Sequence, residues 1–279
     1  MKSAISKKHI YQIFFDSESE KNLDRGFSAL DNTENARPDW YEFWVIKKFL
    51  ENNTLEEGVW YGFLSPKFFS KTGLKSENVY EILDSFGDQG DVILLGVSGW
   101  DQLSYFQNPF EQGNIWHPGL LESSQKFFDQ IGMRIDLSQL VSTTKDSVFS
   151  NYLIAKKPYW DQWLKLANLF FDTVENNTMP ELGIQTSYGS RTNLAPLKTF
   201  IQERFPSIIL SGNLFRVLSA DHGESAPIFT RLFNDDLETR AMLRKCDLLK
   251  QKYRITNDRL FLNEFYETRQ KISFRNPMA

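Results

Sequence analysis

Short apolar runs alternate with helix-like segments along the chain, and this alternation limits the possible folds more than any other feature. Strands are expected at Ile10–Phe15, Val59–Leu64, Asp91–Leu95, Phe149–Ala155 and Leu214–Ser219. Helices are expected between them, over residues 40–51, 76–86, 119–131, 158–175 and 197–210. Asp39 is the expected N-cap of the first helix. Because strands and helices that take turns are typical of layered proteins, the pattern predicts an α/β fold with a mixed sheet flanked by helices.

The length of 279 residues and a hydrophobic content of 41% suit one large core better than two independent domains. We expect residues 1–234 to form the α/β domain. Residues 235–279 have a largely helical pattern and are expected to form a C-terminal extension packed on the same domain. Residues 176–194 are rich in Asn, Thr, Gly and Ser without a clear period, which indicates a mobile excursion that could serve as a lid.

The charge and cysteine content exclude several classes of protein. A net charge of −4 with scattered Lys and Arg gives no general attraction to phosphate backbones, which disfavours nucleic acid as a partner. The single cysteine, Cys246, excludes an internal disulfide and a thiolate metal cage. We interpret it as a helix packing residue in a reducing compartment. The apolar runs are too short for a signal peptide or a transmembrane segment, so we expect a cytoplasmic protein.

One segment, residues 108–122, concentrates polar side chains between glycines and prolines just after a strand-like run. Because Pro109, Gly113 and Pro118 disfavour a regular helix or a central strand, we predict a shaped loop. Loops of this kind often carry binding and catalytic residues. The candidate residues of this segment are Glu111, Gln112, Trp116 and His117.

The chain contains no glycine-rich phosphate loop, dinucleotide fingerprint, paired-histidine zinc motif, nucleophile elbow or kinase motif set. Polar residues do follow several predicted strands, and ligands of open α/β sheets bind outside the carboxyl ends of strands. Groups distant in the sequence are therefore expected to converge there. Most of the aromatic residues are expected in the core. Trp100 and Trp116, which have polar or glycine neighbours, are candidates for stacking on a sugar.

Four segments occur in an order that resembles a bacterial family of predicted glycosyltransferases from surface-polysaccharide loci. They are Tyr61-Gly-Phe-Leu-Ser-Pro-Lys67 with a following Lys-Thr-Gly turn, Asn108-Pro-Phe-Glu-Gln-Gly-Asn-Ile-Trp-His117, Phe149-Ser-Asn-Tyr-Leu-Ile-Ala155, and Lys198-Thr-Phe-Ile-Gln-Glu-Arg-Phe205. That family is similar to single-domain nucleotide-sugar transferases with a GT-A fold. The likeness covers roughly residues 58–210, and the shared order is more specific than any one motif.

The resemblance implies a GT-A-like, Rossmann-like sheet and transfer of a sugar from a nucleotide sugar to a hydroxyl of a glycan or a lipid-linked glycan. Such a reaction needs a base near the acceptor hydroxyl if its course is inverting, and cations or hydrogen-bond donors on the leaving diphosphate. The sequence does not decide between an inverting and a retaining course. The implied roles are a base from His117 or Asp101, donor contacts from Lys67, Lys198, Arg204 and Asn151, and sugar or acceptor contacts from Trp100, Trp116, Glu111 and Gln112.

Two departures from the family pattern affect this interpretation. The family has His-Tyr-Arg-Arg where this chain has Leu64-Ser-Pro-Lys67, which leaves one cation for a diphosphate. The Asp-x-Asp pair that holds Mn²⁺ or Mg²⁺ in many GT-A enzymes is also missing after the strand at residues 91–95. Asp101 alone supplies few ligands for a metal ion, because such ions are usually held by one or two carboxylates together with phosphate and water. The requirement for Mn²⁺ or Mg²⁺ therefore stays open.

Each candidate also has a structural explanation. His117 could cap the following helix, Glu203 and Arg204 could form an intrahelical pair, and Asn151 could be a satisfied core amide. Asp31 with its neighbour could form an Asx-turn.

Two other functions fit the same residues. One is a non-catalytic carbohydrate-binding or scaffold protein of the same fold. The other is a metal-dependent hydrolase that uses Asp101, His117, Asp221 and His222.

Overall fold

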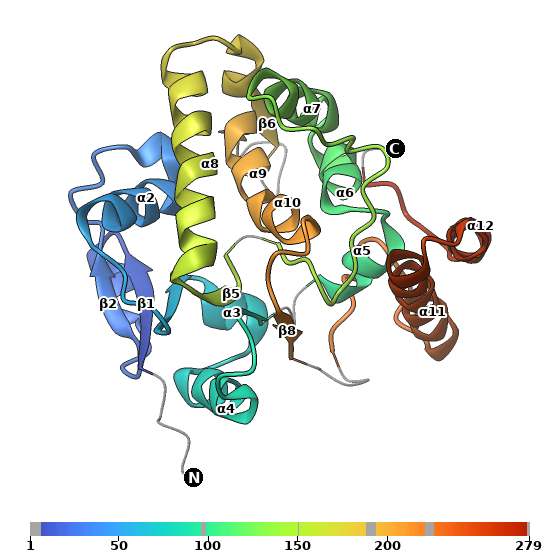
Figure 1. Cartoon of the computed structure of the whole chain (residues 1–279), viewed down its shortest axis with the longest axis horizontal. Coiled ribbons are helices and arrows are strands. Elements are labelled where there is room, and N and C mark those ends of the chain that lie inside the picture. The colour runs from blue at the N-terminus through green and yellow to red at the C-terminus, as the bar shows by residue number, and fades with distance from the viewer. Residues whose placement is uncertain (1–6, 96–98, 150, 188–193, 221–225, 278–279) are drawn as a thin grey trace.

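The computed structural model describes residues 7–95, 99–149, 151–187, 194–220 and 226–277. A six-stranded sheet with the order β2-β1-β3-β5-β4-β8 forms its centre (Figure 1). The strands are β1 (Lys8–Phe14), β2 (Ser28–Asp31), β3 (Trp60–Leu64), β4 (Val92–Leu94), β5 (Leu153–Lys156) and β8 (Val217–Ser219). Strand β5 is antiparallel to both of its neighbours, and the other pairs are parallel. The prediction of an α/β fold with a mixed sheet is confirmed.

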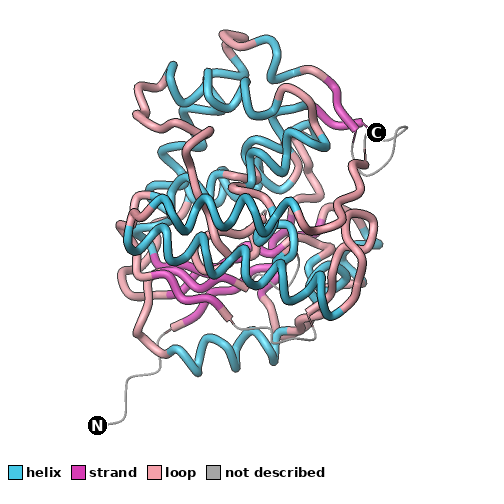
Figure 2. Tube along the Cα trace, turned by 90° about the vertical axis from the view of Figure 1, so that its right-hand side faces the viewer, coloured by secondary structure: helices cyan, strands magenta, loops and turns pink. Residues whose placement is uncertain are grey.

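Helices cover both faces of the sheet (Figure 2). The helices are α1 (Ser17–Lys21), α2 (Glu42–Asn52), α3 (Phe68–Thr72), α4 (Ser76–Phe86), α5 (Trp100–Tyr105), α6 (Pro109–Trp116), α7 (Leu120–Gln130), α8 (Lys157–Glu175), α9 (Leu197–Gln202), α10 (Phe205–Ser211), α11 (Leu237–Thr256) and α12 (Arg259–Gln270). Short 3-10 turns lie at η1 (Pro38–Trp40) and η2 (Pro180–Gly183), and β6 (Gln185–Ser187) pairs with β7 (Leu194–Pro196). None of the described helices is both long enough and apolar enough to cross a bilayer.

The alternation of side chains along the strands separates two apolar layers. Phe63 and Ala155 belong to the layer under α2, α7, α8, α9 and α10, whereas Leu64 and Ile154 belong to the layer under α3 and α4. Buried tryptophan and phenylalanine side chains from α2 and α8 fill much of the first layer. Most of the aromatic residues were expected in the core, and this expectation is confirmed.

The C-terminal helices α11 and α12 pack against each other and form a second apolar cluster with α5. Trp100, Tyr105 and Phe106 contribute to this cluster from the α/β side. Cys246 on α11 lies fully inside it, and burial raises the pKa of its thiol to about 11. The interpretation of Cys246 as a packing residue is confirmed.

The prediction of a loop over residues 108–122 is wrong, because residues 109–116 form helix α6. The Asn108 side chain accepts hydrogen bonds from the backbone N–H groups of Phe110 and Glu111, which makes it an N-cap. Pro109 stands at the first helical position, where its missing N–H costs nothing. The same residues that suggested a loop therefore start a helix.

Several other boundaries differ from the sequence pattern. Strand β2 and helices α1 and α5 were missed, since each is only four to six residues long. Asp39 does not cap α2, whose N-cap is Tyr41. The helix expected over residues 197–210 divides into α9 and α10 near Arg204. Pro206 explains the break, because it has no N–H for the carbonyl one turn earlier.

Candidate functional site

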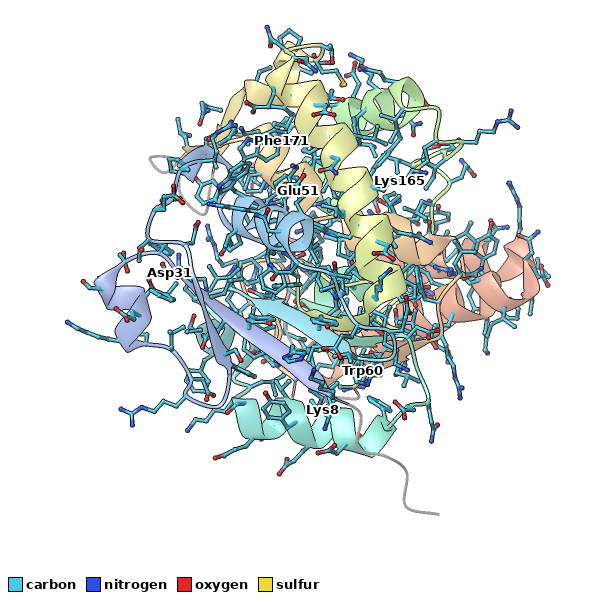
Figure 3. All side chains as sticks on the ribbon, turned by 60° about the vertical axis from the view of Figure 1, so that its left-hand side comes forward. Lys8, Asp31, Glu51, Trp60, Lys165 and Phe171 are labelled. Carbon is cyan, nitrogen blue, oxygen red and sulfur yellow. The ribbon has the colours of Figure 1, made fainter. Side chains whose placement is uncertain are left out.

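The carboxyl edge of the sheet is where a ligand is expected. The strand order reverses between β1 and β3, because β2 lies on one side of β1 and β3 on the other, and open α/β sheets bind ligands outside such a switch point. In Figure 3, Asp31 marks this edge, and Lys8 and Trp60 lie at the opposite end of their strands. Because β5 is antiparallel to β3, the residues that precede β5 reach the same edge.

A small polar cavity lies at this edge, beside the end of β3. Its volume is about 30 Å³. The lining side chains come from the end of β3, helix α3, the residues before β5, helix α9 and the start of α2, and all but one of them carry polar atoms. They are Glu42, Phe63, Ser65, Lys71, Asn151, Tyr152, Gln202 and Glu203. Five separate parts of the chain thus meet at one point.

One polar group of this cavity has no close hydrogen-bond partner among the described residues. The Tyr152 hydroxyl is buried and makes no close hydrogen bond with the described residues, although the side chains of Lys71 and Ser65 lie near enough to lower its pKa. Burial raises the pKa of Tyr152, and the nearby Lys71 ammonium, 5.9 Å from the ring centroid, opposes this shift. Buried polar groups in proteins nearly always have a partner. A hydroxyl without one, at the wall of a cavity, is suited to hydrogen bonding with a bound molecule.

Three of the four segments that carry the family resemblance line this cavity. Ser65 belongs to the first segment, Asn151 to the third and Glu203 to the fourth. Lys71 belongs to the Lys-Thr-Gly turn that follows the first segment. The second segment, residues 108–117, contributes none of the lining side chains.

A second cavity, of about 300 Å³, lies on another side of α3. Its walls combine aromatic rings with polar groups and one cation: Gln12, Asn22, Asp24, Phe27, Phe68, Phe69, Leu74 and Lys75. The Phe69 ring is 53% exposed and can therefore contact a ligand. Helix α3 thus stands between two cavities near the carboxyl edge.

Among the predicted donor-binding residues, Asn151 and Lys67 lie at this edge. Asn151 lines the small cavity. Lys67 is exposed at the start of α3, where its backbone N–H donates to the Ser65 hydroxyl at 3.2 Å. The ammonium of Lys67 is thus placed in solvent one helical turn before Lys71.

Arg204 and Gln112 lie inside the protein and bind each other. The Arg204 guanidinium donates to the Gln112 side-chain oxygen at 2.8 Å, to the Pro109 carbonyl at 2.7 Å and to the Phe200 carbonyl. Burial lowers the pKa of Arg204 to about 10. Gln112 in turn donates to the Gln102 side chain at 2.8 Å. These bonds hold α6 against α9 and leave both residues out of the cavity.

His117 ends α6 and is only 7% exposed. Its ring stacks on Phe200 with 3.5 Å between centroids, and Nδ1 lies 3.3 Å from the Thr186 hydroxyl. Burial, helped by the positive charge of Arg204, lowers the pKa of His117 to about 3. The imidazole is therefore neutral near pH 7. It does not line the small cavity.

Glu111 and Trp116, the other candidates on α6, face the C-terminal region. Glu111 forms a two-point ion pair with Arg269 of α12, at 2.7 and 3.2 Å. It also accepts a hydrogen bond from the Gln107 backbone N–H at 2.6 Å. Trp116 is half-buried, with Phe229 at its edge. Both residues therefore link α6 to the C-terminal part of the chain.

Asp101 and Trp100 begin α5 and are buried. One Asp101 oxygen accepts from the Phe229 backbone N–H at 2.7 Å, and the other has no partner among the described residues. Burial raises the pKa of Asp101. The Trp100 indole donates to the Pro227 carbonyl at 2.9 Å and is 8% exposed, so its ring packs inside the second cluster.

Within the described residues, no group of three or more His, Cys, Asp or Glu side chains comes together as a metal site. Asp101 supplies a single carboxylate, which is short of the donor set that Mn²⁺ or Mg²⁺ needs. Asp221 and His222, which the hydrolase interpretation requires, lie outside the described residues.

Lys198 and Asp31 have structural partners of their own. The Lys198 ammonium pairs with Asp39 at 2.5 Å and lies 4.0 Å from the centroid of the Trp40 ring. Lys198 is 5% exposed. The Asp31 carboxylate accepts from the Thr33 backbone N–H at 2.7 Å, which is the hydrogen bond of an Asx-turn. The Asx-turn interpretation is confirmed.

The comparisons with known proteins add no assignment: no family model, curated protein or solved structure matches the chain. The site therefore depends on its own geometry. Of the residues that line the small cavity, sequence reasoning assigned a site role to Asn151 alone and missed the others. Tyr152 and Gln202 stand next to Asn151 and Glu203 in the quoted segments, whereas Glu42 stands in no motif.

Proposed function

We propose that this chain is a glycosyltransferase with a GT-A-like fold that takes a sugar from a nucleotide sugar and transfers it to a hydroxyl of a glycan. The observation that carries the proposal is the convergence of Ser65, Asn151 and Glu203 on one cavity. Each comes from a different segment of the family resemblance, and these segments are far apart in the sequence. The cavity also lies at the sheet edge where α/β proteins bind nucleotides.

The side chains at the cavity suit the parts of such a donor. Lys71 and the exposed Lys67 provide positive charge for the leaving diphosphate. Asn151 and the unpartnered Tyr152 hydroxyl are suited to hydrogen bonds with sugar hydroxyls. Glu203 is the carboxylate that we assign as the base for the acceptor hydroxyl. This assignment replaces His117 and Asp101, since neither lines the cavity.

Because the two cavities differ in size, we assign different parts of the donor to each of them. A volume of about 30 Å³ is too small for a hexose, so side chains around the small cavity must move when the donor binds. The cavity on the other side of α3 is about 300 Å³ and has the Phe69 ring at its wall. We place the nucleoside there, because an aromatic ring can stack on a base.

Binding of nucleoside diphosphates and nucleotide sugars, with and without Mn²⁺, tests the proposal. We expect at least one nucleoside diphosphate to raise the melting temperature, and the Lys71→Met variant to weaken that binding at least tenfold. Lys126→Met, which changes an exposed lysine on α7, is the matched control and should bind as the unchanged protein does.

The outcomes separate the alternatives. Nucleotide binding without sugar transfer to any acceptor supports the non-catalytic scaffold instead. A shift with Mn²⁺ alone supports the metal-dependent hydrolase. No shift with any nucleotide, in a folded protein, overturns the proposal.

A further inference from the structure

A third cavity, of about 640 Å³, lies between α8, α10 and the segment 133–140. Its size falls within the range of small-molecule sites, which are mostly apolar with a few polar groups. The walls are mainly aliphatic and include Ile135, Leu140, Leu166, Leu169 and Ile209. It differs in both place and chemistry from the polar cavity at the sheet edge.

The absence of aromatic rings from these walls is informative. The chain as a whole is 15% aromatic, yet none of the residues that line this cavity is Phe, Tyr or Trp. A flat heterocycle or a sugar is usually held by an aromatic face. Walls of flexible aliphatic side chains instead suit an alkyl chain, which needs apolar contact but no stacking.

Two apolar side chains of the cavity stay in contact with water. Leu169 is 40% exposed and Leu214 is 69% exposed. Leaving such groups in water has a free-energy cost that burial would remove. Contiguous exposed apolar surface of this kind marks binding sites more often than single exposed residues do.

The charged side chains that line the cavity are both positive. Arg134 and Lys165 line it, and no Asp or Glu does. Within the described part of the chain, neither cation forms an ion pair or a side-chain hydrogen bond. Figure 3 labels Lys165 on α8. An anionic group at the cavity mouth would therefore meet two cations that have no internal carboxylate to compete with it.

We propose that this cavity binds a single-chain anionic amphiphile, with the alkyl chain between α8 and α10 and a phosphate or carboxylate beside Arg134 and Lys165. The site is independent of the proposed transfer reaction, because it shares no residue with either cavity at α3. Loss of nucleotide binding and loss of amphiphile binding can therefore be told apart.

Titration calorimetry with alkyl phosphates of eight, ten and twelve carbons, kept below their micelle concentrations, tests the proposal. Each added methylene should tighten binding about fourfold until the cavity is full. The matching alcohols should bind at least tenfold more weakly than the phosphates. Alkyl carboxylates of the same lengths show which head group is preferred.

Variants link the binding to this cavity. The double variant Arg134→Met with Lys165→Met should remove the preference for phosphate over alcohol and keep the dependence on chain length. Leu169→Gln, a change at a half-exposed position that leaves the core intact, should weaken all chain lengths. Lys126→Met, on α7, should change nothing.

Three results would overturn the proposal. One is equal affinity for all chain lengths, and another is binding that Leu169→Gln does not alter. The third is a dimer that Leu169→Gln dissociates while no alkyl phosphate binds, because a second copy of the chain would then be the occupant. Vesicles of phosphatidylcholine with phosphatidylglycerol separate a free amphiphile from a bilayer lipid: binding to vesicles without binding to soluble chains also contradicts the assignment.

Discussion

Two regions of the molecule are rich in polar side chains, and they use them in opposite ways. In the α6 region, Arg204 and Gln112 bond to each other and to backbone carbonyls, and Glu111 pairs with Arg269. At the carboxyl edge, the Tyr152 hydroxyl makes no close hydrogen bond with the described residues and lines a cavity. A concentration of polar residues in the sequence is thus a weak sign of a site. The difference lies in whether those residues satisfy one another.

The largest expected effect is a loss of catalytic activity that a substitution at the carboxyl edge causes and a substitution in the α6 region does not. Glu203→Gln removes the carboxylate that we assign as the base, and general-base catalysis contributes about 10²–10⁴-fold to a rate. We expect kcat to fall by that factor while donor affinity stays within about threefold. Glu111→Gln, which breaks the ion pair with Arg269, should keep kcat near that of the unchanged protein.

Steady-state kinetics with the donor identified by binding provides the measurement. Circular dichroism of both variants checks that they are folded. Equal losses of kcat in the two variants would contradict the distinction between the regions, and an unchanged kcat in Glu203→Gln would remove Glu203 from the mechanism.

The second effect concerns stability. Arg204→Met leaves the Gln112 oxygen and two carbonyls without their charged donor, inside a buried network. Leaving a buried acceptor without its hydrogen-bond donor typically costs about 1–3 kcal/mol, and three acceptors lose theirs here. The unbranched methionine side chain fills part of the space. We expect the free energy of unfolding in urea to fall by about 3 kcal/mol. A loss below about 1 kcal/mol would show that the network contributes little.

The sequence predicted the layered α/β fold because the alternation of apolar runs with helical segments is a local property. It also named Asn151 as a candidate donor contact, and Asn151 lines the small cavity at the carboxyl edge. The sequence could not show that Asn151 lines the cavity whereas His117 does not, because both are polar residues near apolar runs. Only the three-dimensional structure shows that His117 stacks on Phe200, which comes from a segment more than 80 residues away.

The same limit explains why residues 108–122 were predicted as a loop. Proline and glycine usually interrupt helices. Asn108 followed by Pro109 is, however, also a sequence signal for the start of a helix, because asparagine is a good N-cap and proline is tolerated at the first helical position. The role of Gly113 could not have been noticed. It depends on the Arg204 guanidinium, which reaches α6 from the junction of α9 and α10.

The third effect is a change of stability with pH. The pKa of His117 falls from its usual 6.5 to about 3 on folding, so the unfolded chain binds a proton between these values and the folded chain does not. Stability from this residue is therefore present above pH 6.5 and is lost as the pH falls. The loss at pH 5 is about 2 kcal/mol, from about 1.4 kcal/mol for each pKa unit.

Urea unfolding at pH 7.5 and pH 5.0 measures this loss, with His117→Phe as the reference. The phenylalanine can keep the stacking on Phe200 but does not titrate. The unchanged protein should lose about 2 kcal/mol more than the variant between the two pH values. Equal losses would mean that His117 has the same pKa in the folded and the unfolded chain, which would contradict its burial as a neutral imidazole.

The smallest expected effect gives the sharpest test of how the α6 region is packed. A Cβ added at Gly113 would lie 2.5 Å from the Arg204 guanidinium, which its hydrogen bonds hold in place. The clash should cost about 1–3 kcal/mol. Alanine also favours a helix over glycine by about 1 kcal/mol, so Gly113→Ala should destabilise the protein only by about 1 kcal/mol.

In the Arg204→Met background the clash partner is gone, and the same substitution should stabilise the protein by up to about 1 kcal/mol. This reversal of sign, read from the four urea unfolding curves of a double-mutant cycle, requires direct contact between the two residues. The same sign in both backgrounds would show that Arg204 does not close the space above Gly113.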